Sequence, residues 1–395
     1  MPPTLASASG TGPDLDGLLA EVSARALAAL GPGGPPDLAT LFVTPDFREG
    51  LDGAGEAVRR ATGATRLLGC TGGGVIGAEA EHEGGHAAAL LLARLPGVEV
   101  RPFFVAQEDL EATASPEDLE ARIGVPRESA PSFLLLPDPY TVDADSLLFL
   151  LNAAYPGRPV IGGLASGGRR PGSHALWLDD RVHPGGAAGV ALLGDVEVRP
   201  LVSQGCRPVG RRFAITRCEG PRIFTLAGKP AAEALRETVE SLSPEDRLLA
   251  RTSLHLGRVA EEARPEFRRG DFLIRNLVAL VPEDGSLVVG DQVRPGQTVQ
   301  FQLRDASTAT EDLRALLERA SVRDRPRGAL LFSCGGRGSH LFGEPDHDLR
   351  LVREAFGDLP LAGFFCNGEI GPVGTRNFLH GFTASLALFS ARGGP

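Results

Sequence analysis

The residues best suited to bind a ligand lie near the C-terminus, where an apolar stretch runs into a polar turn. The segment Phe364–Pro372 reads FFCNGEIGP. Gly368 and Gly371 allow tight backbone turns, so Asn367 and Glu369 are expected at a bend where side chains can converge on a ligand. An amide and a carboxylate in such a turn are typical of a binding site rather than of a reaction.

A second candidate is Arg337, which lies in the glycine turn that follows the apolar run Ala329–Cys334. Glycines such as Gly338 let the backbone approach a ligand, and the guanidinium offers a fork for a carboxylate or phosphate. With Glu369 accepting an ammonium group and Asn367 donating to a carboxylate, the three side chains would recognise an amino-acid zwitterion. The alternatives are a surface arginine in a flexible turn and two side chains that only cap their own turn.

Two Arg-containing pairs supply further candidates. Arg275 with Asn276 lies in the predicted strand Asp271–Val281, and Arg304 with Asp305 directly follows the predicted strand Gln297–Leu303. They would form further walls of the site or an internal ion pair, and the structural interpretation is favoured because Arg and Asp in a strand-rich core are often mutual partners.

Cys334 and Cys366 each end an apolar strand beside a glycine turn. A thiol nucleophile needs a base, which His340 or His380 would have to provide. Buried cysteine that packs as a small hydrophobe is the commoner case, so we assign no catalytic residue.

Several motif matches fail on their context. His82–His86 has the letters of H-E-x-x-H, but its two glycines oppose the helix that a zinc site needs. Gly72–Gly77 matches G-x-G-x-x-G without a following helix, and Gly205–Arg212 lacks the Lys and Ser/Thr of a phosphate-binding loop. The polar cluster from His340 to Asp348 is interpreted as helix capping and solvated charge. We predict no metal and no cofactor.

The elements that must position these residues recur along the chain. A strand, a glycine turn and a second strand appear at Leu67–Leu91, Val160–Leu193 and Leu361–Leu388, at periods of about 90 and 200 residues. A strand and a helix precede the later two copies, at Phe133–Pro137 with Ala144–Ala154 and at Ala329–Cys334 with Asp346–Phe356. Such units often pack by pseudo-symmetry and bring equivalent turns together. Asn367 and Glu369 are particular to the last copy, since the others have Gly, Ala or Ser at comparable positions.

These patterns predict an α+β protein of two related domains, with mixed sheets and helices packed outside. The predicted helices are Leu15–Leu30, Gly53–Thr62, Pro230–Glu240 and Pro244–Arg251, in addition to those above. Residues 1–14 are expected to be disordered because the first dozen are rich in Pro, Gly, Ser and Thr. Residues 15–200 form the predicted N-terminal domain and residues 201–395 the C-terminal domain.

Composition narrows the class of protein. A chain of 395 residues should contain two or three packed units. Its formal charge of −10, with no basic stretch, argues against a nucleic-acid partner. Neither a signal peptide nor a run of roughly 20 apolar residues is evident, and the five scattered cysteines suggest neither disulfides nor a zinc site. We therefore expect a cytoplasmic protein without a membrane partner.

The motifs together resemble the FIST family, in its arrangement of an N-terminal and a C-terminal domain. The resemblance is carried by Gly69–Thr71, Phe272–Asn276, Val299–Asp305, Ser333–Gly338 and Asn367–Pro372, and it extends over roughly Leu38 to Phe389. It implies a sensory domain that binds small ligands such as amino acids and works with a signalling partner. The candidate ligand contacts are Arg337, Asn367, Glu369, Gly338, Gly368, Arg275, Asn276, Arg304, Asp305, Cys334, Cys366 and Thr71.

We therefore predict a small-molecule-binding sensory protein, with the ligand in a cleft lined by the glycine turns. The alternatives are an enzyme that acts on a small carbonyl or amide compound through Cys366 or Glu369, and a scaffold that binds a peptide or protein. Neither the ligand, the output nor the oligomeric state follows from the sequence.

Overall fold

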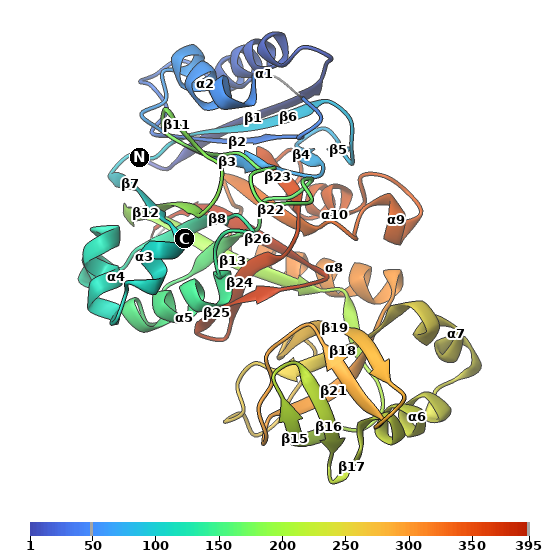
Figure 1. Cartoon of the computed structure of the whole chain (residues 1–395). Helices are drawn as coiled ribbons and strands as arrows, with labels where there is room; N and C mark the ends of the chain where they lie inside the picture. The colour runs from blue at the N-terminus through green and yellow to red at the C-terminus, as the bar shows by residue number, and fades with distance from the viewer. Residues whose placement is uncertain (48–49, 393–395) are drawn as a thin grey trace. The chain divides into compact units, whose positions relative to one another are not determined.

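The repeated modules form three mixed β-sheets, which Figure 1 shows. The computed structural model describes residues 1–47 and 50–392. In each module a first strand and a second strand run parallel and are joined by a helix, and a third strand lies antiparallel beside the first. The modules are β2 (Leu38–Val43), α2 (Ala54–Thr62), β3 (Arg66–Thr71) and β6 (Ala87–Arg94); β8 (Ser132–Pro137), α5 (Ala144–Ala154), β9 (Val160–Gly163) and β12 (Ala187–Gly194); and β22 (Gly328–Cys334), α10 (His347–Phe356), β23 (Leu361–Cys366) and β26 (Thr383–Ala391). The predicted repeats and the α+β class are confirmed.

One glycine occupies the same position in the second strand of every module. Gly69 is paired with Leu41, Gly162 with Leu135 and Gly363 with Leu331 across the parallel strands. A Cβ at these glycines would lie 2.3, 1.8 and 1.8 Å from the carbonyl oxygens of those leucines. Any side chain would force the parallel strands apart, so glycine is required, and these positions align the three modules residue by residue.

Each module also gives a hairpin to the sheet of another module. The hairpin β4 (Val75–Gly77) and β5 (Glu81–His82) follows β3 but pairs with β23. The hairpin β10 (Leu176–Leu178) and β11 (Arg181–His183) follows β9 but pairs with β3. The strands β24 (Glu369–Val373) and β25 (Arg376–His380) follow β23 but join the sheet of β9. The exchange runs in a closed cycle through all three sheets.

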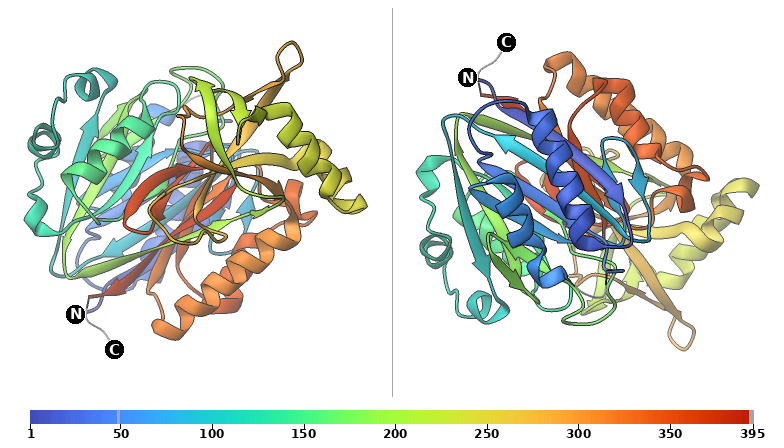
Figure 2. Two further views of the ribbon diagram at one scale, coloured as in Figure 1. Left: turned by 90° about the horizontal axis from the view of Figure 1, so that it is seen from below. Right: turned by 90° about the horizontal axis from the view of Figure 1, so that it is seen from above.

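The sheets share one central core and carry helices on their outer faces. Strands β1 (Thr4–Thr11), β7 (Val98–Val105) and β13 (Val196–Gln204) complete the three sheets beside β6, β12 and β26. Residues from all three sheets, such as Phe42, Leu134 and Phe332, pack in a single cluster. Helix α1 (Leu15–Leu30) and α2 cover the first sheet, as the right-hand view of Figure 2 shows. Helices α3 (Gln107–Glu111), α4 (Pro116–Ile123) and α5 pack on the second.

A separate β-structure is built from the middle of the chain. Its strand path is β14 (Cys206–Pro208), β21 (Thr298–Arg304), β15 (Phe213–Glu219), β16 (Arg222–Leu226), β20 (Ser286–Val289), β19 (Phe272–Val281) and β18 (Leu254–Val259), with β17 (Lys229–Pro230) beside β16. Because β18 pairs again with β21, the path closes on itself as a barrel. Helices α6 (Ala231–Ser241) and α7 (Pro244–Ser253) belong to the same unit.

The compact units do not follow a single cut in the sequence. The first comprises Met1–Val202, Arg314–Leu379 and Thr383–Pro395, and the second comprises Ser203–Leu313 and His380–Phe382. The third module therefore folds with the first two, although more than a hundred residues of barrel separate them in the chain. Helix α8 (Ala306–Arg323) begins in one unit and ends in the other.

The prediction that residues 1–14 are disordered is wrong for most of that segment. Thr4–Thr11 form β1, which pairs antiparallel with β6 along its whole length. Its Leu5, Ala6 and Ala8 are buried. The small Ser, Thr, Ala and Gly residues that resembled a flexible terminus allow this strand to lie close to its neighbours.

Helix boundaries followed the periodic pattern closely where capping residues were present. Helix α1 spans the predicted residues because Asp14 accepts a hydrogen bond from the Gly17 N–H at 2.8 Å and Gly31 ends the helix. Helix α8 was not predicted, nor were α3 and α4. Short α9 (Ser339–Phe342) follows the turn that holds Arg337.

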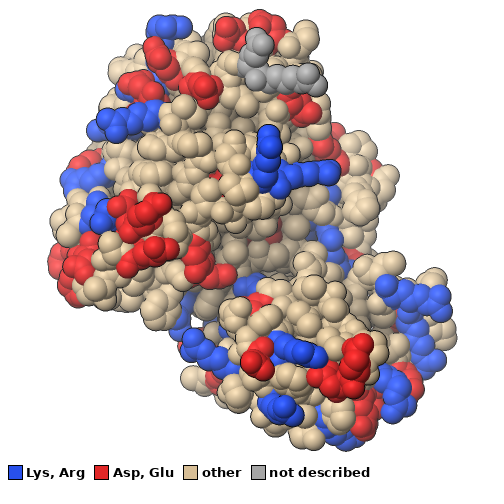
Figure 3. Space-filling view, in the orientation of Figure 1, with Lys and Arg blue, Asp and Glu red and all other residues tan. Residues whose placement is uncertain are grey.

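Two features of the molecule bear on its environment. No helix among the described residues is long and apolar enough to span a bilayer. On the face drawn in Figure 3, basic and acidic side chains are interspersed rather than gathered by sign.

Candidate functional site

The equivalent turns of the three modules meet and hydrogen-bond to one another. The Ser166 N–H donates to the Thr71 carbonyl at 3.1 Å, and the Asn367 N–H donates to the Leu164 carbonyl at 3.2 Å. The Gly73 N–H donates to Ser166 Oγ at 2.8 Å, and that hydroxyl in turn donates to the Phe365 carbonyl. The turns predicted to come together therefore do so, and they form a ring of backbone contacts.

A small cavity lies at this ring. Its volume is about 170 Å³, and it is lined by Gly73, Glu83, Ser166, Gly167, Gly335, Arg337, Phe365, Cys366 and Asn367. Of the predicted ligand contacts, Arg337, Asn367 and Cys366 line it. Thr71 is buried at the end of β3, and its Oγ1 accepts from the Ala175 N–H.

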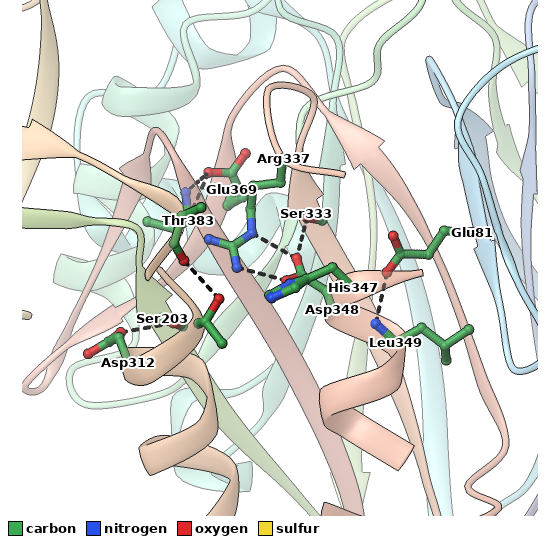
Figure 4. Close-up of polar contacts among 12 residues, drawn as sticks. Glu81, Ser203, Asp312, Ser333, Arg337, His347, Asp348, Leu349, Glu369 and Thr383 are labelled. Atoms are coloured by element: carbon green, nitrogen blue, oxygen red, sulfur yellow. Dashed lines mark hydrogen bonds and ion pairs between the residues drawn. The ribbon is translucent and has the colours of Figure 1, made fainter. Parts of the chain in front are cut away.

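Arg337 is a buried cation held by a buried anion, as Figure 4 shows. Its Nε and Nη2 donate to the two oxygens of Asp348 at 2.7 and 2.8 Å. Asp348 lies in the first turn of α10 (His347–Phe356), and it also accepts from Ser333 Oγ at 3.0 Å. The pair of guanidinium nitrogens Nε and Nη2, which could have bound a ligand carboxylate, is thus occupied by Asp348.

One nitrogen of this guanidinium is buried without a hydrogen bond to any described residue. Within residues 1–47 and 50–392, Nη1 of Arg337 has no hydrogen-bond partner. Burial by itself would lower the pKa of Arg337, but the adjacent Asp348 raises it above its ordinary value, so the group stays charged. A buried charged N–H without a partner is uncommon in native proteins and marks a place for a water or a ligand.

Glu369 lies deeper than the cavity wall. It is fully buried at the start of β24, and its Oε2 accepts from the Thr383 N–H at 3.0 Å and from Thr383 Oγ1 at 2.7 Å. The equivalent residues of the other modules, Val75 and Leu176, are apolar. Gly368 contributes a carbonyl that accepts from the Leu164 N–H at 2.8 Å.

The carboxylate on the cavity wall is Glu83, which we did not predict. Its two oxygens accept from the Ser339 N–H at 2.7 Å and from Ser339 Oγ at 2.6 Å. A Cβ on Gly338, where φ is +74°, would lie 2.8 Å from this carboxyl group. Glycine at 338 thus allows Glu83 to tie the β5 hairpin to the turn that carries Arg337.

The polar cluster from His340 to Asp348 is only partly solvated, which corrects our interpretation in part, since His340 and Glu344 are exposed. His347 and Asp348 are buried, and His347 stacks on Phe342 with ring centroids 3.4 Å apart. Asp346 makes no capping bond to the helix and accepts from the Glu81 N–H instead. The interpretation rested on capping signals, which depend only on residues near the helix start. In the structure the hairpin of β4 and β5, from another module, packs on the start of α10.

Glu81 is an unusual carboxyl group in this hairpin. It is buried, and its Oε1 accepts from the Leu349 N–H at 2.8 Å. Burial and the nearby charge of Asp348 raise the pKa of Glu81 to about 8. It is therefore mostly protonated at neutral pH.

An eight-residue insertion distinguishes the second module beside the cavity. In each hairpin one residue pairs with the shared glycine of another module, and these residues are Ile76 in the first module and Trp177 in the second. Trp177 lies fifteen residues after Gly162, whereas Ile76 lies seven residues after Gly69. The inserted loop is held by His174, whose Nε2 accepts from the Gly168 N–H at 3.1 Å and whose Nδ1 lies 2.7 Å from Asp138 Oδ2. Both side chains of this pair are fully buried.

The remaining candidates belong to the barrel unit and have partners there. Arg275 Nε donates to Asp291, and Asp305 accepts from Arg207 Nε at 2.9 Å and from the Thr308 N–H at the start of α8. The Arg304 guanidinium lies 5.0 Å from the centre of the Phe382 ring. Asn276 is exposed, and its carbonyl accepts from the Gly290 N–H. The ion-pair partners of Arg275 and Asp305 are thus Asp291 and Arg207, not the residues beside them in the sequence.

The Cys366 thiol at the cavity is not activated. Cys366 Sγ donates to the Ser333 carbonyl at 3.2 Å, and burial raises the pKa of its thiol well above the ordinary value. A neutral thiol is a poor nucleophile. Cys334 is half-buried, and its carbonyl accepts from the Arg337 N–H. Over the described part of the chain, no three His, Cys, Asp or Glu side chains are grouped to hold a metal ion.

Comparison with known proteins identifies two family domains in this chain. The FIST N domain matches residues 37–229, and the FIST C domain matches residues 231–372. An uncharacterized protein of Mycobacterium tuberculosis is 40% identical over 381 residues, which cover 96% of this chain and 97% of that protein. An uncharacterized protein of Mycobacterium bovis is 48% identical over 258 residues, or 65% of this chain and 67% of its own. An F-box/LRR-repeat protein of Arabidopsis thaliana is 30% identical over 124 residues, or 26% of this chain and 23% of that protein.

Proposed function

The chain belongs to the FIST family, whose domains are associated with sensory signal transduction, and we propose that it senses a small zwitterionic metabolite such as an amino acid. The ligand is held in the cavity where the three module turns meet. The observation that carries the proposal is the buried guanidinium of Arg337, which lines this cavity and keeps Nη1 without a partner among the described residues.

The charges around the cavity favour a ligand that carries both signs. Asp348 compensates the charge of Arg337 through two hydrogen bonds. The carboxylate of Glu83 on the cavity wall is therefore a negative charge that Arg337 does not balance. A ligand ammonium group would be bound by Glu83 and by the amide oxygen of Asn367. A ligand carboxylate oxygen would accept from Nη1 of Arg337, since hydrogen bonds between charged partners are stronger than neutral ones.

The cavity volume limits the ligand to a small molecule. A volume of about 170 Å³ corresponds to roughly five or six liquid waters at about 30 Å³ each. Drug-sized ligands occupy clefts of about 300–1,000 Å³. Small amino acids fit this limit better than nucleotides or peptides do.

Glu83 also offers a route from ligand to signal. Its carboxylate holds the start of α9 through Ser339. An ammonium group at Glu83 would compete for the same oxygens and change the free energy of that contact. A ligand shifts a conformational equilibrium only if it binds the two conformations with different affinity. A signalling partner would then bind differently to the two positions of the turn between Gly335 and Ser339.

Calorimetry with glycine, L-alanine, L-serine, L-leucine and L-arginine tests the proposal. Glu83→Gln and Asn367→Ala should each weaken binding of the small amino acids by about tenfold or more, because hydrogen bonds to charged groups contribute about 1.5–3 kcal/mol. Glu79→Gln, in the same acidic turn but outside the cavity wall, should bind as wild type does. Absence of binding by every amino acid in the panel, or binding unaffected by both cavity variants, would overturn the proposal.

A further inference from the structure

Each of the three modules contributes one equivalent residue to the wall of the cavity. The modules can be aligned on the shared glycines at 69, 162 and 363. Four residues after these glycines lie Gly73, Ser166 and Asn367. All three line the cavity. They are therefore equivalent positions with different side chains, since Gly73 has none, Ser166 has a hydroxyl group and Asn367 has an amide.

The ring of backbone bonds is regular at two corners and altered at the third. Ser166 and Asn367 donate through their backbone N–H groups to the carbonyls of Thr71 and Leu164. The matching bond would run from the Gly73 N–H to the Phe365 carbonyl, but the Ser166 hydroxyl stands between them and bonds to both. The ring is thus widened on the side of Gly73.

Gly73 leaves this widened side without a side chain. An ideal Cβ there would lie 3.5 Å from the Gly167 nitrogen and 3.6 Å from Gly167 Cα and Ser166 Oγ, which are ordinary van der Waals distances. Its neighbours differ: a Cβ at Gly72 would lie 2.7 Å from Phe364 Cβ, and one at Gly74 would lie 2.6 Å from the His82 carbonyl. Gly72 and Gly74 are required by packing, whereas the packing at Gly73 leaves space for a methyl group.

We infer that Gly73 determines the size of the ligand, because the variable substituent of a bound amino acid lies against it. Ser166 and Asn367 contact the polar head of the ligand, and the missing side chain at 73 provides the space for its substituent. This inference rests on the proposed function. It predicts a site that accepts a short substituent and that one methyl group on the protein would restrict to glycine.

The test compares wild type, Gly73→Ala and the control Gly53→Ala by calorimetry with glycine, L-alanine and L-serine. Gly53 has a φ of −90° and no atom within 4 Å of its ideal Cβ, so its substitution controls for loss of a glycine. In Gly73→Ala, affinity for glycine should change less than about threefold, and retained glycine binding also shows that the variant is folded. Affinity for L-alanine and L-serine should fall by about tenfold or more, or about 1.4 kcal/mol.

The possible failures are distinguishable. If wild type binds these amino acids and Gly73→Ala weakens all of them equally or none of them, the inference is wrong and the proposed function stands. If Gly73→Ala loses glycine binding and its melting temperature matches that of wild type, the substituent does not lie at Gly73. If wild type binds no amino acid, the proposed function fails, and this inference fails with it.

Discussion

Arg337 and Asp348 form the most buried charged pair at the cavity, and each makes the other tolerable in the core. Taking a charge out of water is costly, and removal of one partner leaves the other charge uncompensated. Asp348→Ala should therefore lower the free energy of unfolding by about 3–5 kcal/mol, measured by urea denaturation at pH 7.

Glu56→Ala is the matched control, because Glu56 forms an exposed pair with Arg60 at 3.9 Å. This variant should unfold at nearly the same urea concentration as wild type. Equal losses in the two variants would show that the Arg337–Asp348 pair has no special energetic role.

Glu81 predicts a pH dependence of stability whose sign can be worked out. Its pKa is about 8 in the folded protein against an ordinary value of 4.5, because burial and Asp348 disfavour the charged form. Between these pH values the folded protein keeps the Glu81 proton, whereas the unfolded chain releases it. The contribution of Glu81 to the free energy of unfolding is therefore complete below pH 4.5 and is lost as the pH rises towards 8.

Glu81→Gln removes this titration but keeps an oxygen for the Leu349 N–H. The fall in the free energy of unfolding between pH 5 and pH 8 should be smaller in the variant by on the order of a few kcal/mol. Chemical denaturation at the two pH values measures it. Identical pH slopes in wild type and variant would mean that Glu81 is ionised in the folded protein.

At the scale of elements, the glycine shared by the three second strands makes the parallel pairing possible. Gly162→Ala should lower the free energy of unfolding by about 3 kcal/mol, at the upper end of the cost of overpacking, because its Cβ would lie 1.8 Å from the Leu135 carbonyl oxygen and the strands must move apart. Gly53→Ala should leave stability nearly unchanged. Thermal unfolding of both variants provides the comparison.

The inserted loop of the second module depends on the buried pair of His174 and Asp138. Because the Gly168 N–H donates to Nε2, the proton of the neutral imidazole lies on Nδ1 and is donated to Asp138. His174→Phe keeps a ring but loses both hydrogen bonds, so trypsin should cleave after Arg169 at least several-fold faster than in wild type. Ser173→Ala, which removes only two hydrogen bonds to the Arg170 backbone in the same turn, should be cleaved at the wild-type rate.

Sequence patterns were informative wherever an element was amphipathic or capped locally. The repeated strands, the glycine turns and helices such as α1 and α5 were predicted to within a few residues. The strand β1 was missed because its small residues resemble a flexible terminus. Helix α8 was missed although its start is capped by Asp305, whose carboxylate accepts from the Thr308 N–H.

The candidate site was only partly predictable, for a reason that lies in the hairpin exchange. Arg337 and Asn367 could be recognised from glycine turns in their own module. Glu83 comes from another module, so no local spacing in the sequence connects it to these two residues. Glu369 shares the turn of Asn367 and was therefore predicted as a ligand contact, although it accepts hydrogen bonds from Thr383 inside the fold. The position of Ser166 could have been found by aligning the three modules on their shared glycine.

At the scale of the whole molecule, the family domains and the compact units divide the chain differently. The FIST N domain match ends at residue 229 and the FIST C domain match begins at residue 231, yet the first compact unit needs strands from both. Residues 1–202 alone lack β23, which pairs with β4, and also β24.

A fragment of residues 1–202 should therefore fail to fold cooperatively. We expect it to bind the dye ANS and to show no sharp urea transition, whereas the full chain shows one. A fragment with a single cooperative transition and no exposed apolar surface would mean that the first two modules fold without the third.

The closed exchange of hairpins also constrains how the chain is made. During synthesis the hairpin at Val75–His82 emerges about 280 residues before Leu361–Cys366, the strand with which its Val75–Gly77 strand pairs. At about 5–20 residues per second, the ribosome needs roughly 15–60 s to supply that partner. The first module must therefore wait with an unpaired sheet edge, and this interval is when the nascent chain is most exposed to aggregation and most dependent on chaperones.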